Sequence, residues 1–178
     1  MMKIVELSAI EYQGYELEYS YITKAYYDVV IKKKRGITIN IKRKKMIRKT
    51  EKTFKSKLFE PYVEKPKVYA IFDRKKMVGV IEGSIESWNN RFRIWNFLVD
   101  KKYRGEGYGR ALFEHMLKIA DSEKARAVIL EVQSCNDPAI SFYMKQGFHF
   151  VGLNTMDYTN HDIENKEVRL EMAKRILM

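Results

Sequence analysis

Residues 97–110 read FLVDKKYRGEGYGR, an apolar run that leads through charged residues into glycines at positions 105, 107 and 109. Apolar residues then recur at helical spacing, which predicts a helix from about Gly107 to Ser122 with a buried stripe of Leu112, Met116, Ile119 and Ala120. The stretch is therefore a strand, a glycine turn and a helix. Glycines allow close approach of backbone to a ligand, and a helix N-terminus carries partial positive charge, so the turn suits a pyrophosphate.

Neighbouring cations strengthen this interpretation, although a plain glycine-rich connection would explain the turn alone equally well. The cations are Lys101, Lys102, Arg104 and Arg110. A P-loop is excluded because no Gly-Lys-Ser/Thr follows. The dinucleotide-binding fingerprint also fits poorly, since Arg110 stands where its third glycine is required.

A second cluster follows on the next strand and helix. Residues 127–132 form an almost uninterrupted apolar run, typical of a strand covered on both faces, and Glu131 lies within it. A helix is predicted from Asp137 to Gln146, because Pro138 suits its first turn and Gly147 its left-handed exit. Ala139, Phe142, Tyr143 and Gln146 share one face of that helix.

Together the two motifs resemble the GCN5-related N-acetyltransferases (GNAT). The matching pattern is Arg104-x-x-Gly107-x-Gly109 after a strand, then Asn136-x-x-Ala139-x-x-Phe142-Tyr143-x-x-x-Gly147-Phe148. The resemblance covers residues 68–153 and is small over the first 60. Within the superfamily the run from Ile94 to Gly147 is most similar to streptothricin acetyltransferase-like members, which confer antibiotic resistance.

The resemblance implies a fold and a cosubstrate. The fold is α+β or α/β: a mixed, mostly antiparallel twisted sheet, splayed at the cofactor site, with helices on both faces. Acetyl-CoA would be the cosubstrate. Its pantetheine arm would pair with the backbone of Phe97, Leu98 and Val99. Amides of Arg104, Gly105, Glu106, Gly107, Tyr108, Gly109 and Arg110 would hold its pyrophosphate. Asn136, Ala139 and Phe142 would contact the cofactor arm, and Tyr143 would face the sulfur.

The resemblance also suggests an acid–base pair. Tyr143 would protonate the leaving thiolate, and Glu131, twelve residues earlier, would take the amine proton, as in the family's ribosomal-protein N-terminal acetyltransferases. Two alternatives stay open: Glu131 as an ordinary strand glutamate, and Tyr143 as a core aromatic. Some relatives carry a base carboxylate where this chain has Trp95-Asn96, which leaves Glu82 and Glu86 as further candidates acting through water.

The remaining pattern predicts mainly strands in one domain, 1–178. Alternation over 15–31 and 37–41 predicts a Tyr-rich hairpin, followed over 43–60 by a basic helix or irregular arm, so that 1–60 is the divergent part. Strands are expected near 68–72, 77–88 and 92–99 in the cofactor-binding core, 68–153. Further strands are expected near 148–153 and 167–173, the latter in the C-terminal region 154–178.

Charge is concentrated in one segment. The chain has a formal charge of +11, and residues 32–57 hold thirteen Lys/Arg against Glu51, which makes +12 and leaves about −1 for the rest. The segment could bind nucleic acid or another acidic partner, but a solvated basic face beside an enzyme core is the expected interpretation. A non-catalytic acyl-CoA sensor is a third reading. Amine-dependent release of CoA separates enzyme from sensor, and salt-dependent nucleic-acid binding identifies the module.

Composition limits the other classes of protein. One cysteine, Cys135, excludes an internal disulfide, and three scattered histidines give no metal site. Neither a signal peptide nor an eighteen-residue apolar span is present, so we expect a cytoplasmic protein with no membrane partner. The acceptor would be a small cationic amine, such as an antibiotic of streptothricin or aminoglycoside type or a polyamine, or else a protein amine. The Tyr-rich hairpin is a candidate homodimer interface.

Overall fold

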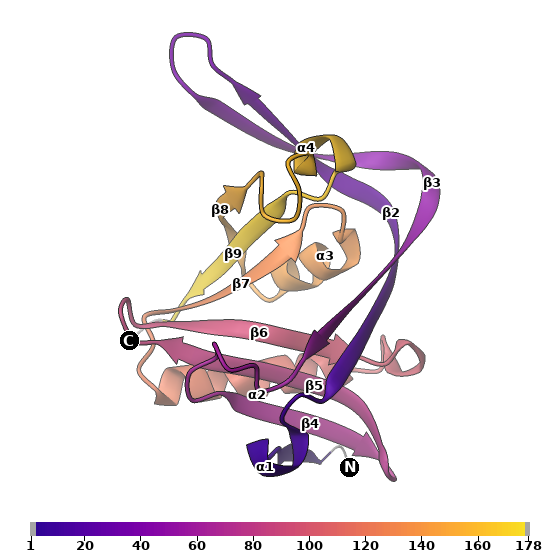
Figure 1. Ribbon diagram of the computed structural model, residues 1–178, viewed down its shortest axis with the longest axis vertical. Helices are drawn as coiled ribbons and strands as arrows, with labels where there is room; N and C mark the ends of the chain where they lie inside the picture. The colour runs from indigo at the N-terminus through magenta and orange to yellow at the C-terminus, as the bar shows by residue number, and fades with distance from the viewer. Residues whose placement is uncertain (1–2, 177–178) are drawn as a thin grey trace. The chain divides into compact units, whose positions relative to one another are not determined.

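The computed structural model describes residues 3–176, and these are mostly in strands (Figure 1). In chain order the elements are β1 (Ile4–Glu6), α1 (Ala9–Tyr12), β2 (Glu16–Lys32), β3 (Thr38–Lys57), β4 (Lys67–Asp73), β5 (Lys76–Glu86), β6 (Arg91–Val99), the 3₁₀ turn η1 (Lys101–Tyr103), α2 (Tyr108–Ser122), β7 (Ala127–Gln133), α3 (Asp137–Lys145), β8 (His149–Asn154), α4 (Asp162–Asn165) and β9 (Arg169–Arg175). The chain divides into two compact units. The first holds the described residues of 1–19, 54–130 and 174–178, and the second holds 20–53 and 131–173.

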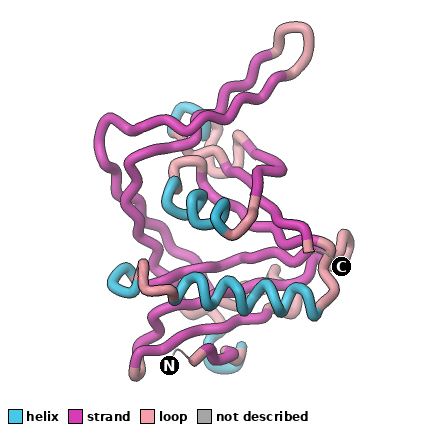
Figure 2. Tube along the Cα trace, turned by 180° about the vertical axis from the view of Figure 1, so that it is seen from behind, coloured by secondary structure: helices cyan, strands magenta, loops and turns pink. Residues whose placement is uncertain are grey.

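The sheet is mixed and mostly antiparallel, as predicted. In the first unit the strand order is β1-β4-β5-β6-β7, with antiparallel pairs except for parallel β6–β7. β7 continues into the second unit, where the order is β7-β9-β8 and β8–β9 is antiparallel. Helix α2 lies across one face of β4, β5 and β6 in the first unit (Figure 2).

Helix α2 confirms the predicted helix within one residue at its start. Leu112, Met116 and Ala120 of the predicted stripe are fully buried, and Phe113 joins them, whereas Ile119 is only half-buried. On the opposite face of the sheet, a separate cluster packs Val80 with residues from the N-terminal segment and the end of β3; it comprises Leu7, Leu17, Leu58, Phe59, Val68, Ala70 and Val80. The central strands therefore have apolar cover on both faces.

The basic segment 43–60 is not a helix or an irregular arm, so that prediction was wrong. β3 continues as a strand to Lys57 and forms a two-stranded sheet with β2. Cross-strand ion pairs explain the extended conformation: Lys44 Nζ lies 2.5 Å from Asp28, and Lys55 Nζ lies 2.6 Å from Glu16. The acids belong to β2, so local composition around 43–60 could not reveal them.

A β-bulge reverses the facing of β6. Ile94 is paired with Gly83, but Asn96 is paired with the preceding residue, Glu82, so Trp95 is the extra residue. Before the bulge, Phe92 lies beside Gly83 on the face that α2 covers. After it, Phe97 takes the α2 face, where its ring lies 5.4 Å from that of Phe113.

The close approach of β5 and Phe92 generates the first prediction. A Cβ on Gly83 would lie 2.3 Å from Cε1 of Phe92 and 3.0 Å from the carbonyl oxygen of Arg93. Gly83→Ala should therefore lower the free energy of unfolding by about 1–3 kcal/mol in urea titrations, as overpacking does. Gly152→Ala is the matched control, because its nearest atom is the flexible carboxylate of Glu171 at 3.0 Å. We expect the control to stay within about 0.5 kcal/mol of wild type; equal effects of the two changes would contradict the packing argument.

Candidate functional site

The glycine turn presents backbone N–H groups at the start of α2. Gly105 and Gly107 have φ of +87° and +89°, the left-handed region that glycine adopts without strain. Gly107 is the N-cap of α2 and supplies no side chain, so the first N–H groups of the helix receive no capping bond. Around Gly105, nothing lies within 4 Å of where a Cβ would be. The turn thus offers open, unshielded donors for an anion.

The turn is held onto the end of β6. Arg104 Nε donates a 2.9 Å hydrogen bond to the carbonyl oxygen of Val99. A Cβ on Gly109 would lie 3.3 Å from both Phe97 and Val99, so glycine lets the first turn of α2 lie close to the strand. The predicted residues 97–99 and 104–110 are therefore brought together within one unit.

Charged side chains around the turn are exposed and partly paired. Lys101 and Lys102 are exposed, with no acid of residues 3–176 within ion-pair distance, while Arg110 Nε is 2.7 Å from Glu114 one helical turn later. That pair raises the pKa of Arg110, through the hydrogen bond and then the charge of Glu114. The positive field at the turn hence comes mainly from the two lysines, Arg104 and the helix itself.

β6 pairs with β5 along its length and with β7 over its first residues. Phe97, Leu98 and Val99 pair with Ile81, Val80 and Gly79 of β5. The parallel pairing with β7 joins residues 91–94 to 127–130. Within the first unit, the parallel pairing with β7 thus precedes the residues 97–99 that lead into the glycine turn.

In the second unit, Asn136 starts α3. Its Oδ1 accepts a 3.3 Å hydrogen bond from the N–H of Ala139, and Pro138 occupies the first turn, as predicted. Gly147 has φ of +87° and ends the helix region. The side-chain oxygen of Asn136 is thus used by the fold, while its amide nitrogen has no hydrogen-bond partner among the described residues.

Tyr143 is a buried aromatic residue on α3. It is 8% exposed, and its ring lies 5.7 Å from Phe142 and 6.3 Å from Phe148. Burial raises the pKa of the Tyr143 phenol well above its usual range. The hydroxyl therefore keeps its proton at neutral pH and is available as a donor.

Glu131 on β7 is bound to an arginine. Its Oε2 lies 2.6 Å from Nη2 of Arg169 on β9. The same guanidinium lies 3.1 Å from Asp157 and 3.6 Å from Glu171. The Glu131 carboxylate is thus part of a charged network centred on Arg169. Sequence gave no sign of this, since Arg169 lies in the tail that shows no motif.

One face of the β5–β6 ladder is polar. We call it the polar face, and it consists of Glu82, Ser84, Glu86, Arg91, Arg93, Trp95 and Asn96. At its centre, Asn96 Nδ2 donates to Glu82 Oε2 at 2.6 Å, and the N–H of Phe59 donates to Glu82 Oε1 at 2.8 Å. The hydroxyl of Tyr19 donates to Asn96 Oδ1 at 2.9 Å. Segments far apart in the sequence thus meet around one glutamate.

The second glutamate of the polar face is neutralised. Glu86 accepts from Arg93 Nε at 2.8 Å and from Arg91 Nε at 3.0 Å. Burial alone would raise the pKa of Glu86, but the hydrogen bonds and charges of the two arginines outweigh it and lower the pKa. Glu86 is therefore a structural anion and a poor candidate for a base.

The architecture and the two motifs have a counterpart in a known family. The family model for the acetyltransferase (GNAT) family matches residues 40–148, more than half of the chain. The chain belongs to the GNAT family. This agrees with the resemblance that the glycine turn and the Asn136 motif carry.

GNAT relatives match in sequence over the same core. A streptothricin acetyltransferase of Streptomyces lavendulae is 37% identical over 82 residues, 46% of this chain and 43% of that protein. The [ribosomal protein bS18]-alanine N-acetyltransferase of Escherichia coli K12 is 32% identical over 85 residues, 48% of this chain and 56% of that protein. The chain spans less than two thirds of these curated relatives.

Solved GNAT structures share the fold over nearly the whole chain. A nourseothricin acetyltransferase superposes with a TM-score of 0.79 at 24% identity, covering 98% of both chains. A Bacillus anthracis protein in complex with acetyl coenzyme A gives 0.74 at 23% identity, covering 99% of this chain and 98% of that one. Residues 1–60, which show little of the family pattern in sequence, are thus part of a fold that these structures share.

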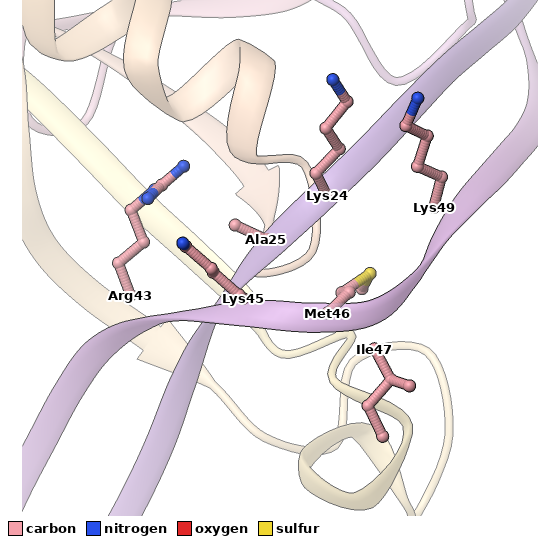
Figure 3. Close-up of a pocket in the computed structure, with 7 residues that line it drawn as sticks. All are labelled: Lys24, Ala25, Arg43, Lys45, Met46, Ile47 and Lys49. Atoms are coloured by element: carbon pink, nitrogen blue, oxygen red, sulfur yellow. The ribbon is translucent and has the colours of Figure 1, made fainter.

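The basic segment contributes a pocket in the second unit. It has a volume of about 380 Å³ and is lined by Lys24, Ala25, Arg43, Lys45, Met46, Ile47 and Lys49 (Figure 3). Arg43 is paired with Asp137 at 2.7 Å and 3.0 Å, and Lys52 with Glu167. Acids of the same unit therefore neutralise part of the segment, which weakens its case as a nucleic-acid surface.

Metal binding and membrane insertion can be compared with the described part of the chain. Within residues 3–176 no group of three or more His, Cys, Asp or Glu side chains is arranged to hold a metal ion. No helix there is long and apolar enough to cross a membrane.

Proposed function

We propose that the chain transfers an acetyl group from acetyl-CoA to a primary amine. The observation that carries the proposal is the turn at the start of α2, where Gly105 and Gly107 expose backbone donors beside the end of β6. An anionic pyrophosphate fits this geometry, since helix N-terminal N–H groups and the helix dipole both favour it. The Bacillus anthracis protein with the same fold is bound to acetyl coenzyme A, which supports the choice of cosubstrate.

The sequence motifs assign the contacts to acetyl-CoA within each unit separately. The N–H groups of Tyr108, Gly109 and Arg110 would bind its phosphates, and, as the GNAT resemblance implies, the backbone of Phe97–Val99 would hydrogen-bond the pantetheine amides as an added strand does. The amide nitrogen of Asn136, which the fold leaves without a partner, would donate to the same arm. Ala139 and Phe142 would supply apolar contact.

The chemistry requires a proton acceptor and a group that stabilises a thiolate. A lysine-like amine has a pKa of about 10.4, so only about one molecule in a thousand or fewer is neutral at pH 7. Once neutral, the nitrogen attacks the thioester carbonyl, the N–C bond forms and the C–S bond breaks. The Tyr143 hydroxyl would donate a hydrogen bond to the departing sulfur. Because burial raises the pKa of Tyr143, we expect stabilisation of the thiolate rather than early, complete proton transfer.

The acceptor we favour is a small polycationic amine of streptothricin type. The relatives named for streptothricin and nourseothricin support this choice. A peptide or protein amine is the alternative, supported by the relative named for a ribosomal-protein alanine. A spermine/spermidine N(1)-acetyltransferase of Bacillus subtilis is 28% identical over 83 residues, so polyamines are also candidate acceptors. We place the protein in the cytoplasm, where acetyl-CoA is made.

A panel of acceptors tests the function directly. Purified protein is incubated with acetyl-CoA and a streptothricin, an aminoglycoside, spermidine or an alanine-ended peptide, and free thiol is measured. We expect thiol release that depends on the amine, with kcat/KM for the streptothricin at least about tenfold above that for the peptide. A tenfold preference for the peptide would contradict the streptothricin-type acceptor but would leave the proposed acetyl transfer intact. Binding of acetyl-CoA without release by any amine would identify a sensor instead.

The turn predicts a binding variant. Gly107→Val adds bulk at φ of +89°, where a β-branched residue is strained, and covers the donors of the turn. In thermal-shift titrations wild type should gain about 2.7 kcal/mol at a hundredfold excess of acetyl-CoA over Kd, and the variant should gain little.

Gly36→Val is the matched control for backbone strain. Gly36 also has positive φ, +125°, with nothing within 4 Å of a Cβ, and it lies at the tip of the β2–β3 hairpin. This variant should keep the full gain with acetyl-CoA. If Gly107→Val also keeps it, the pyrophosphate binds elsewhere.

The Tyr143 hydroxyl on α3 can be tested by a substitution that should lower kcat. Tyr143→Phe removes only the hydroxyl, so packing against Phe142 and Phe148 and affinity for acetyl-CoA should survive. The kcat should fall on the order of a hundredfold, with little change in KM. Steady-state and single-turnover rates with the best acceptor provide the measurement. Nearly full kcat, with chemistry shown to be rate-limiting, would remove Tyr143 from the mechanism.

A further inference from the structure

Glu82 is a carboxyl group buried without a counter-charge. Its exposed fraction is 0%, and no lysine or arginine of the described residues lies within ion-pair distance. Burying a charge without a counter-charge costs free energy of folding. A carboxyl kept in such a place is therefore a candidate for a functional group. Glu86, four residues later on the same face of β5, shows the ordinary solution, with two arginines around it.

The hydrogen bonds around Glu82 are those of a carboxylate. Each oxygen accepts from a nitrogen donor, Oε1 from the N–H of Phe59 and Oε2 from the amide nitrogen of Asn96. Both oxygens of an ionised carboxylate are acceptors, so both donors suit the charged form of Glu82. The site is thus arranged for an anion, yet it holds no cation, so it suits an incoming cation or an incoming proton.

Burial acts against the anion. It raises the pKa of Glu82, with a smaller increase from the charge of Glu60, and the bonds from Asn96 and Phe59 only partly oppose this. A carboxylate of raised pKa is a better proton acceptor than Glu86, whose pKa the two arginines lower.

The position of Glu82 connects it to the end of β6. Its partner across the ladder is Asn96, which directly precedes Phe97. From Asn96 the network reaches Tyr19, a half-buried residue whose ring stacks on the 44%-exposed Phe54 at 4.4 Å. Aromatic faces beside a buried carboxylate favour a cationic ligand.

We infer that Glu82 accepts the proton of the acceptor's ammonium group and that Asn96 and Tyr19 position it. This rests on the proposed function. One N–H bond of the ammonium breaks, its electron pair stays on nitrogen, and the proton passes to a Glu82 oxygen through one water. The neutral amine then attacks the thioester carbon, the C–S electrons leave with sulfur, and the proton lost from nitrogen in the addition goes to water.

Amine basicity provides the test. Two acceptors are compared. One is the best alkylamine from the panel, and the other is an analogue with fluorines on the carbon one bond further from the nitrogen, which lower the pKa of the amine so that it is neutral at pH 7. With Glu82→Gln, kcat/KM for the alkylamine should fall on the order of a hundredfold, typical of general-base loss. For the fluorinated amine, which needs no prior deprotonation, the loss should stay below about tenfold. Glu131→Gln is the matched control and should affect the two amines equally.

The outcomes separate the two levels of the proposal. Equal losses for both amines with Glu82→Gln would show a purely structural role and overturn the inference, while the proposed function stands. A selective loss with Glu131→Gln instead would also overturn it. Absence of turnover by the wild-type protein with every amine would overturn the proposed function and this inference together. Unchanged acetyl-CoA binding by Glu82→Gln in thermal-shift titrations checks that the variant is folded.

Discussion

The β-bulge at Trp95 is the constraint on which the site depends. A strand alternates its side chains strictly, so without an extra residue Asn96 would share a face with Ile94 and Phe92 and lie under α2. The bulge restores Phe97 and Val99 to the α2 face and leaves Asn96 opposite Glu82. One inserted residue thus determines the side chains on both faces of the sheet. It allows apolar packing under α2 next to the glycine turn, and a polar contact between Asn96 and Glu82 on the other face.

That packing explains why the turn can be rigid while consisting largely of glycine. Gly109 lies against Phe97 and Val99, and Arg104 closes the loop onto the carbonyl of Val99. The positive φ values at 105 and 107 are therefore supported by fixed neighbours on both sides of the turn. Donors held in place before a ligand arrives lose little entropy on binding, which is the advantage of a preformed site.

Sequence predicted the parts that depend on local pattern. The strand, glycine turn and helix around 97–122, and the helix that Asn136 caps, follow from spacing and capping chemistry and are confirmed as structure. The segment 43–60 was mistaken because its acids, Asp28 and Glu16, lie on another strand. The bulge at Trp95 and the pairing of Glu131 with Arg169 were equally invisible, since register and long-range ion pairs depend on tertiary contacts.

The three glutamates differ by their partners, although a sequence presents them as equal. Glu86 and Glu131 each lie against guanidinium groups, and for Glu86 these groups lower the pKa of the carboxyl. Glu82 is buried with only neutral donors, and burial raises the pKa of its carboxyl. A base for an ammonium ion must be ionised before the substrate arrives and must gain from taking its proton. Of the three, only Glu82 is in surroundings that meet both conditions, because its hydrogen bonds maintain the anion and its burial favours neutralisation.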